Sequence, residues 1–354
     1  MTAAPPAVAF DGVSIVFGAD PASALPLMDA GRTRAEVLAE TGQVLGVHDC
    51  SLEVGQGEIV VLMGLSGSGK STLLRAVNGL NPVVRGEVRV ADGAGGADGA
   101  VSVTRARGRA LRRLRQGRIA MVFQQFGLLP WRDVRANVGL PLELAGVPPR
   151  ERRARVDRQL ELVGLLDRAD APVGELSGGM QQRVGLARAF ATEAPILLMD
   201  EPFSALDPLI RTRLQDELLA LQAELRKTIV FVSHDLDEAF KLGNRIAIME
   251  GGRIVQCGTP SEIVTAPADA YVADFVAHMN PLGVLRAADV AEPGRAGEGA
   301  PVAADLPLRE AMALAAARPA PIPVLGSDGA PLGALDAASI LRRLGEPPRP
   351  GAPG

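Results

Sequence analysis

The sequence predicts an α/β fold with a parallel β-sheet and a phosphate-binding loop, and three observations support this. Residues 64–71, Gly-Leu-Ser-Gly-Ser-Gly-Lys-Ser, match the pattern G-x-x-x-x-G-K-[ST] at every fixed position. The apolar runs at 195–199 and 228–232 are continuous, as the buried strands of a parallel sheet require. Two carboxylates, Asp200 and Glu201, follow the first of these runs. The acids are therefore expected at the end of a buried strand, in a chain that also carries a phosphate loop.

The phosphate loop lies between a strand expected at 58–63 and a helix expected at 72–77. Its glycines let successive backbone N–H groups turn toward an anion, and the helix N-terminus adds a partial positive charge. Lys70 is one of only three lysines among 37 basic residues, which indicates a compact charge for the β- and γ-phosphates. The residues expected to bind the phosphates are Gly64, Leu65, Ser66, Gly67, Ser68, Gly69, Lys70, Ser71 and Thr72.

The acid pair supplies the chemistry that a bound phosphate chain requires. Asp200 is expected to hold Mg²⁺, with the hydroxyl of Ser71 as a second protein oxygen on the metal. Glu201 is expected to position and activate the attacking water. A structural turn is the alternative for two acids at a strand end, and the upstream phosphate loop disfavours it.

The composition allows one large domain and a smaller one in 354 residues. A net charge of −4 and an aromatic content of 3% argue against nucleic-acid binding, and the arginine-rich run at 105–118 is expected to be a solvated helix face. Cys50 and Cys257 are expected to be free thiols in a reducing cytosol. The N-terminus lacks the features of a signal peptide, and no apolar run approaches the about 20 residues that span a bilayer. Any membrane role is therefore expected to come through partner subunits.

Periodicity places further elements along the chain. Strands are expected at 13–17, 47–53, 58–63 and 86–91, and helices at 27–42, 149–168, 180–192 and 208–226. After residue 280 the composition shifts to Ala, Pro and Gly, but 305–344 keeps a small α+β pattern. Its expected elements are a helix at 308–317, strands at 321–325 and 331–335, and a helix at 337–344. The last ten residues are rich in Pro and Gly and are expected to be disordered.

Six motifs in a fixed order resemble the ATP-binding subunit of an ABC transporter. They are the phosphate loop, Val-Phe-Gln at 122–124, Leu-Ser-Gly-Gly-Met at 176–180, Leu-Met-Asp-Glu at 198–201, Ser-Ala-Leu-Asp at 204–207 and Val-Ser-His at 232–234. The resemblance covers roughly residues 8–265. It implies an ABC ATPase domain at 1–280, with a RecA-like core, an antiparallel β subdomain and a helical subdomain at about 125–192. Residues 281–354 are then a C-terminal extension.

The resemblance also implies roles for residues of the same chain. Gln124 is expected to link the γ-phosphate and Mg²⁺ to the transmembrane partner, so that the metal is held by Ser71, Gln124 and Asp200. His234 is expected to contact the γ-phosphate and to act with Lys70 and Glu201 in catalysis. A neutral histidine can donate to a phosphate oxygen at pH 7, although a structural histidine is the alternative. Phe17 is expected to stack on adenine, with a core aromatic as the alternative.

Other residues are expected to serve the nucleotide of a second subunit. The resemblance implies that Ser177, Gly178 and Gly179 bind the ATP held by the opposite copy, and that Asp207 communicates across the dimer. A helix is expected to start near Met180, so the N–H groups of this segment and the helix dipole are available to a second phosphate chain.

A closer resemblance is to the quaternary-amine importers, which take up glycine betaine, proline betaine and choline. Residues 28–42, here called the leader segment, resemble the leader of that family. The segments 124–131, 207–213 and 271–282 are most similar to its choline-import branch. The osmoregulated members carry two modules of the cystathionine-β-synthase (CBS) type, whereas 305–344 resembles a single degenerate one. That departure puts sensing of ionic strength or nucleotide by this tail in doubt.

The expected function is therefore ATP hydrolysis that energises import of a quaternary amine, choline or glycine betaine. The resemblance implies ATP and Mg²⁺ as cofactors, and as partners a second copy of the chain, transmembrane permease subunits and an extracytoplasmic substrate-binding protein, with no nucleic acid. It places the chain peripherally on the cytoplasmic face of the inner membrane. The alternatives are import of a different solute and a soluble non-transport ABC ATPase. The second is disfavoured because the gap between Lys70 and Ser177 has no sustained heptads.

Overall fold

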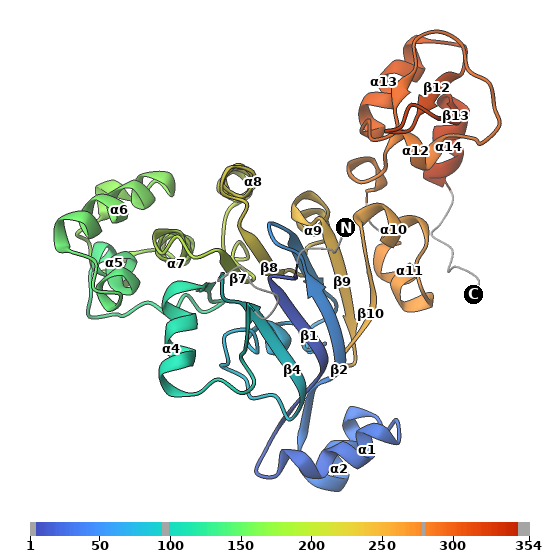
Figure 1. Cartoon of the computed structure of the whole chain (residues 1–354). Coiled ribbons are helices and arrows are strands. Elements are labelled where there is room, and N and C mark those ends of the chain that lie inside the picture. Colours follow the sequence, from blue (N-terminus) through green and yellow to red (C-terminus); the bar gives the residue numbers. More distant parts are fainter. Residues whose placement is uncertain (1–4, 94–98, 278–279, 346–354) are drawn as a thin grey trace. The chain divides into compact units, whose positions relative to one another are not determined.

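The computed structural model describes residues 5–93, 99–277 and 280–345 (Figure 1). The chain divides into two compact units: a first unit of Met1–His234 with Met249–Ile254, and a second unit of Asp235–Ile248 with Val255–Gly354. The division expected between residues 280 and 281 rests on motif content rather than on packing, and it stays a prediction.

An antiparallel sheet in the first unit has the strand order β2-β1-β4-β5. Its strands are β1 (Val8–Phe17), β2 (Val44–Val54), β4 (Arg85–Ala91) and β5 (Ala100–Ser102). The strand expected at 13–17 begins earlier because β1 continues through a bulge, where the register with β2 and β4 shifts and Gly12 has a φ of 55°. This sheet is the expected antiparallel β subdomain.

A second sheet carries parallel strands in the order β3-β8-β7-β6. Its members are β3 (Ile59–Met63), β6 (Ile119–Val122), β7 (Ile196–Asp200) and β8 (Thr228–Val232). Every residue of β3, β7 and β8 is buried, which explains their uninterrupted apolar sequences. The ends of β9 (Arg245–Glu250) and β10 (Arg253–Gly258) that belong to this unit complete the sheet beyond β3. Parallel strands bring their carboxyl ends to one edge, where the phosphate loop and Asp200 follow.

Apart from the short helices between β1 and β2, the helices of the first unit fall into two groups. In one, α5 (Val134–Leu144), α6 (Pro149–Leu162) and α7 (Gly178–Ala191) pack together as the expected helical subdomain (Figure 1). Along the chain, η2 (Leu166–Arg168) and η3 (Val173–Glu175) lie between α6 and α7. In the other are α3 (Lys70–Leu74), α4 (Gly108–Gly117) and α8 (Pro208–Leu225). Helix α4 buries only Leu114, so the prediction that the arginine run forms a solvated face is confirmed.

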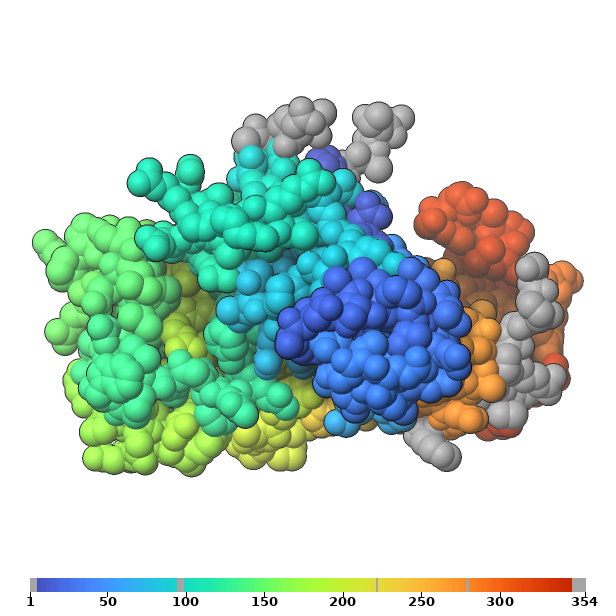
Figure 2. Space-filling view, turned by 90° about the horizontal axis from the view of Figure 1, so that it is seen from below, coloured from blue at the N-terminus to red at the C-terminus, as the bar shows by residue number. Residues whose placement is uncertain are grey.

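The single helix expected at 27–42 is wrong, because the leader segment is broken. After η1 (Pro21–Ala24), the chain forms α1 (Leu25–Asp29) and then α2 (Arg34–Thr41). Gly31 has a φ of 73°, and Thr33 starts α2 with a capping box to Glu36. Met28 and Val37 are fully buried against Val16 and Leu45, which fixes both helices on the antiparallel sheet. In Figure 2, viewed from below, the leader is part of the blue mass that faces the viewer.

The second unit contains the small α+β module. The helices of the unit before the module are α9 (Leu236–Leu242), α10 (Pro260–Thr265), α11 (Ala270–Val276), η4 (Pro281–Gly283) and α12 (Ala287–Val290). Those of the module are α13 (Leu308–Ala317) and α14 (Ala337–Gly345). The strands β11 (Val302–Ala303), β12 (Ile322–Leu325) and β13 (Pro331–Leu335) form a sheet in that order. One core joins the module to Val264 and Phe240. The predicted disordered tail lies largely at 346–354, outside the described residues, and stays a prediction.

Candidate functional site

The phosphate loop requires glycine at two positions for steric reasons. Gly64 has a φ of 139°, and a Cβ there would lie 2.1 Å from the carbonyl oxygen of Met249. Gly69 has a φ of 105°, and a Cβ there would lie 2.6 Å from the carbonyl oxygen of Gly46. Both positions therefore exclude a side chain, and the loop follows β3 directly into the N-terminus of α3.

A cavity of about 700 Å³ opens beside this loop. Many residues predicted to bind the nucleotide line it: Phe17, Ser66, Gly67, Gly69, Lys70, Ser71, Thr72, Gln124, Glu201 and His234. Gly64, Leu65, Ser68 and Asp200 do not line it. Ser68 is buried, whereas the side chain of Leu65 is exposed. The cavity has the volume that small-molecule sites in proteins commonly have.

Lys70 lies at the start of α3 and is buried. Its Nζ donates hydrogen bonds to the carbonyl oxygens of Gly64 at 2.8 Å and Leu65 at 3.0 Å. Burial lowers the pKa of Lys70, and the charges of Glu201 and Asp200 oppose that shift. The ammonium is therefore held on the loop by neutral carbonyls, which an anion in the cavity can replace as partners.

Asp200 ends β7 and is fully buried. Its Oδ1 accepts a hydrogen bond from Ser71 Oγ at 2.6 Å, and its Oδ2 accepts one from an Arg75 Nη at 2.8 Å. A carboxylate and a hydroxyl that already touch at the end of a phosphate loop are oxygen donors of the kind that Mg²⁺ prefers. Arg75 was not predicted from the sequence. Its position one turn after Ser71 on the helix is the signal that could have identified it.

Glu201 brings two other predicted residues together. Its Oε2 lies 3.3 Å from His234 Nδ1 and accepts a hydrogen bond from Gln124 Nε2 at 3.2 Å. The three residues follow β7, β8 and β6, so the parallel sheet delivers them to one point. Gln182, a buried residue of α7, donates to the Glu201 carbonyl at 3.1 Å and accepts from Ala205 N at 3.0 Å. The sequence analysis did not identify Gln182, because no local pattern marks such a contact.

Phe17 and His234 both face the cavity rather than the core. Phe17 ends β1 and is 37% exposed, which contradicts the alternative of a core aromatic. The side chain of His234 is 62% exposed and lines the cavity. Leu38 and Val44 line the same cavity as Phe17, together with Arg34. These three additional residues were not predicted.

The residues expected to act in trans lie outside this cavity. Ser177, Gly178, Gly179 and Asp207 are absent from its lining. Ser177 is the N-cap of α7, and its Oγ accepts from Met180 N at 3.4 Å. Asp207 is the N-cap of α8 and accepts from Ile210 N at 3.0 Å. Ser177 and Gly178 are exposed, so this helix N-terminus faces solvent in the isolated chain.

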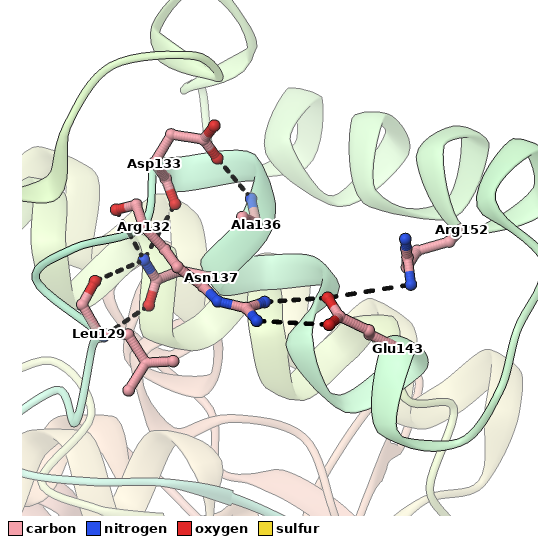
Figure 3. Close-up of polar contacts among 7 residues, drawn as sticks. All are labelled: Leu129, Arg132, Asp133, Ala136, Asn137, Glu143 and Arg152. Atoms are coloured by element: carbon pink, nitrogen blue, oxygen red, sulfur yellow. Dashed lines mark hydrogen bonds and ion pairs between the residues drawn. The ribbon is translucent and has the colours of Figure 1, made fainter.

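The loop after Gln124 is held by a buried asparagine (Figure 3). Asn137 is fully buried, and its Oδ1 accepts from Leu129 N at 2.7 Å. Its Nδ2 donates to the carbonyls of Leu129 at 3.1 Å, Arg132 at 3.2 Å and Asp133 at 2.9 Å. Figure 3 also shows Arg132 paired with Glu143, at 2.9 Å and 3.3 Å. The loop is therefore rigidly attached to α5 while Trp131 stays 76% exposed.

An apolar groove of about 280 Å³ lies beside the same loop. Residues from the RecA-like core and from the helical subdomain line it together: Asn78, Leu80, Arg115, Ile119, Ala120, Met121, Phe123, Gly127, Leu140, Pro141, Leu144, Arg188, Ala189 and Thr192. Leu80 and Leu144 are exposed, large apolar side chains. No helix in the described part of the chain is long and apolar enough to cross a membrane.

The motifs and the site geometry agree with comparisons to known proteins. The family described as ABC transporter matches residues 47–204. The trimethylamine N-oxide transport system ATP-binding protein TmoW of Ruegeria pomeroyi is 44% identical over 336 residues, which cover 95% of this chain and 96% of that protein. The chain belongs to the ABC transporter ATP-binding proteins. As an ABC ATPase, it binds and hydrolyses ATP.

Two further relatives of this ABC ATPase differ in how much they share with it. The glycine betaine/proline betaine transport system ATP-binding protein ProV of Salmonella typhimurium is 49% identical over 276 residues, covering 78% of this chain and 67% of that protein. The solved dimeric structure of MJ0796, a bacterial ABC transporter cassette, has a TM-score of 0.61 and 30% identity, covering 71% of this chain and 98% of that one. The predicted membership of the quaternary-amine uptake family is supported, whereas these relatives do not test the choline branch.

Proposed function

We propose that the chain energises import of a small methylated amine, choline or glycine betaine, through a membrane ABC transporter. The observation that carries the proposal is the similarity to TmoW, which extends over 95% of this chain. That relative is named for trimethylamine N-oxide, and ProV is named for glycine betaine and proline betaine. These solutes share a methylated, positively charged nitrogen. The ATPase does not contact the solute, so the similarity points to the chemical class rather than to one member.

The geometry supports specific roles at the nucleotide. Ser71, Asp200 and Gln124 would hold Mg²⁺, which when bound neutralises charge on the β- and γ-phosphates. Lys70 would exchange its loop carbonyls for phosphate oxygens. Glu201 would orient and activate the attacking water, with His234 beside it for the γ-phosphate. Phe17 would stack on adenine at the rim of the cavity.

A second copy of the chain would complete each site. Ser177, Gly178, Gly179 and Asp207 lie outside the cavity of their own chain, on two helix N-termini. The N-terminus of α7 presents N–H groups and a partial positive charge, which suit the phosphates of a nucleotide held by another copy. The similar cassette MJ0796 is dimeric in its solved structure.

The permease would dock on the loop and groove near Gln124. The exposed side chain of Trp131 and the apolar groove beside Phe123 and Gly127 are typical of a protein-binding surface. Phe126, Leu128 and Leu129, three further apolar residues of this loop, are each partly buried. Docked in this way, the chain would lie on the cytoplasmic face of the inner membrane, with an extracytoplasmic protein that delivers the solute.

The test is uptake in cells that lack this gene. Radiolabelled choline, glycine betaine, proline betaine, trimethylamine N-oxide and taurine are compared after complementation with the wild type or with Glu201→Gln. We expect uptake of at least one methylated amine to return only with the wild type. Unchanged uptake of all four methylated amines, with loss of taurine uptake, would contradict the substrate class and leave the ATPase assignment standing.

A further inference from the structure

The leader segment reaches into the nucleotide cavity, although no nucleotide-binding motif lies in it. Helix α2 contributes Arg34, Ala35 and Leu38 to the cavity lining. These residues face the same space as Gly67, Gly69 and Lys70 of the phosphate loop. The segment is therefore positioned to act on the bound nucleotide directly.

The side chain of Arg34 contacts the backbone of the phosphate loop. Its guanidinium donates to the carbonyl oxygens of Gly67, Gly46 (2.5 Å) and Ser68 (3.5 Å). Gly67 and Ser68 belong to the loop, whereas Gly46 belongs to β2, which forms another wall of the cavity. A single side chain thus ties the loop to the antiparallel sheet. The guanidinium carries several donors in a rigid fork, so it can bond to several carbonyl oxygens at once, which the single ammonium of a lysine cannot reproduce.

These contacts bear on how the loop presents its N–H groups. The carbonyl of one residue and the N–H of the next belong to one peptide plane and point in opposite directions. The carbonyl of Ser68 accepts from Gly252 N at 3.1 Å as well as from Arg34 at 3.5 Å. Both donors favour an orientation in which the N–H of Gly69 faces away from them. A cationic donor on a carbonyl also polarises the peptide group and strengthens its N–H as a donor. Arg34 is a positioning residue in this sense.

The position of Arg34 is itself fixed by the leader. Thr33 N donates to Glu36 Oε2 at 2.7 Å, and Glu36 N donates to Thr33 Oγ1 at 3.3 Å, so Arg34 begins a firmly capped helix. Asp29 pairs with Arg85 at 2.6 Å and adds a link to β4. The Nε of Arg34 is buried without a hydrogen-bond partner among the described residues. Burying a polar atom in this way costs free energy, which the carbonyl contacts offset.

The leader also contributes an apolar side chain, Leu38, to the cavity. Leu38 is 48% exposed, Val44 is 52% exposed and Phe17 is 37% exposed, and all three line the cavity. They come from the leader, the start of β2 and the end of β1. Exposed apolar side chains that converge on one cavity with a phosphate loop at its other side are typical of a wall for a flat apolar ligand group.

We propose that helix α2 of the leader segment is part of the nucleotide site, with Arg34 positioning the phosphate loop and Leu38 covering the nucleobase. This inference rests on ATP binding in the cavity. It adds one residue that acts on the phosphates through the loop and one that contacts the base. The two roles are separable, because a ligand without a base needs only the first.

The experiment measures calorimetric binding of Mg·ATP and of magnesium tripolyphosphate to the full-length chain. We expect Arg34→Ala to weaken binding of both ligands by about tenfold, as the loss of charged hydrogen bonds does. Leu38→Ser should weaken ATP by about fivefold, from lost apolar contact, and leave tripolyphosphate unchanged. Guanidinium ion at millimolar concentration should restore part of the phosphate affinity of Arg34→Ala, because it fits the space that the side chain leaves.

Matched variants separate these effects from general damage. Arg32→Ala removes the same charge from an exposed residue of the leader, whose guanidinium pairs with Glu36 at 3.2 Å and does not line the cavity. This variant should bind both ligands like the wild type. If Arg34→Ala does not fold, Arg34→Gln keeps a single amide donor and should still weaken both ligands about threefold. Wild-type binding of both ligands by Arg34→Ala or Arg34→Gln, or equal weakening of both ligands by Leu38→Ser, would overturn the inference. If the wild-type chain binds no ATP, that result would instead contradict the proposed function.

Discussion

The two regions expected to contact nucleotide, the phosphate-loop cavity and the segment at the N-terminus of α7, are built in different ways. On the phosphate-loop side, Lys70 and Ser71 already have protein partners at hydrogen-bond distance. Both residues line a cavity of about 700 Å³. The other side, here called the signature side, consists of residues 176–180 and the N-termini of α7 and α8. There Ser177 and Gly178 are exposed, Ser177 caps α7 and Asp207 caps α8. The difference teaches that one chain holds a preformed half-site, whereas the exposed N-terminus of α7 has no nucleotide cavity of its own, and the proposal assigns it to the half-site of another copy.

The largest expected effect is at Glu201, on the preformed side. Glu201→Gln should lower ATP turnover by about a thousandfold, because an amide cannot act as a base, while ATP binding persists. Phosphate release and ATP binding measure the two properties, and size-exclusion chromatography should show an ATP-bound dimer. Glu224→Gln, at an exposed position of α8, is the control. Turnover near the wild-type rate would exclude Glu201 as the catalytic carboxylate.

A substitution on the signature side should separate binding from turnover. Ser177→Arg should reduce turnover at least about a hundredfold, because a long cation replaces the cap of α7 where a second phosphate chain is expected. ATP affinity measured on the monomer should stay within about twofold, since Ser177 does not line the cavity. Ser327→Arg, in an exposed turn of the second unit, serves as the control. The assignment in trans fails if Ser177→Arg weakens ATP binding by the isolated chain.

Asn137 should affect the stability of the loop after Gln124, where we propose that the permease docks, rather than the chemistry. Asn137→Ala removes four hydrogen bonds from a fully buried side chain and should destabilise the protein by about 2–4 kcal/mol. Uptake should fall more than ATP turnover, because the loop after Gln124 loses its anchor. Chemical denaturation measures the first effect, and Gln116→Ala, an exposed residue of α4 with a single bond at 3.3 Å, should change stability by less than about 0.5 kcal/mol. Equal loss of uptake and turnover would contradict this role.

The smallest expected effect on transport is that of the C-terminal module. Deleting residues 285–354 should leave uptake per molecule, and its response to salt, largely unchanged, because none of the residues that line the nucleotide cavity belongs to this segment. The deletion also uncovers Val264 and Phe240, which pack against the module core, so a lower yield of protein is expected. Uptake and abundance are therefore measured together. Loss of uptake at normal abundance would show that the module is required.

Elements with strong local signals were predicted well from the sequence. Helix α13 has the expected bounds, Leu308–Ala317, and β7 differs by one residue from the run at 195–199. Continuous apolar runs and clear turn residues specify such elements without reference to the rest of the chain. The leader failed as a single helix because Gly31 and the cap at Thr33 break it within a pattern that otherwise favours helix. Helix α5 was not predicted, and it contains Pro141.

The site was predicted only where motifs define it. The sequence indicated Glu201, His234 and Gln124, and the fold brings the last two within hydrogen-bond distance of Glu201. Arg34 and Asn137 were missed because their partners are backbone groups: carbonyl oxygens for both, and for Asn137 also the N–H of Leu129. A carbonyl looks the same at every position of a sequence, so only the tertiary fold shows which carbonyls a buried donor will meet.

The backbone of Glu201 has a consequence for the evolution of stability. Its φ of 49° lies in the left-handed region, which costs a residue with a Cβ roughly 1 kcal/mol relative to glycine. Substitution to glycine would therefore relax the turn and stabilise the fold while removing the carboxylate. Selection for fold stability alone would therefore favour glycine over Glu201 at this position. The proposed catalytic role of Glu201 accounts for a residue with a Cβ at this position. A screen for thermostable variants should therefore recover inactive proteins altered at Glu201.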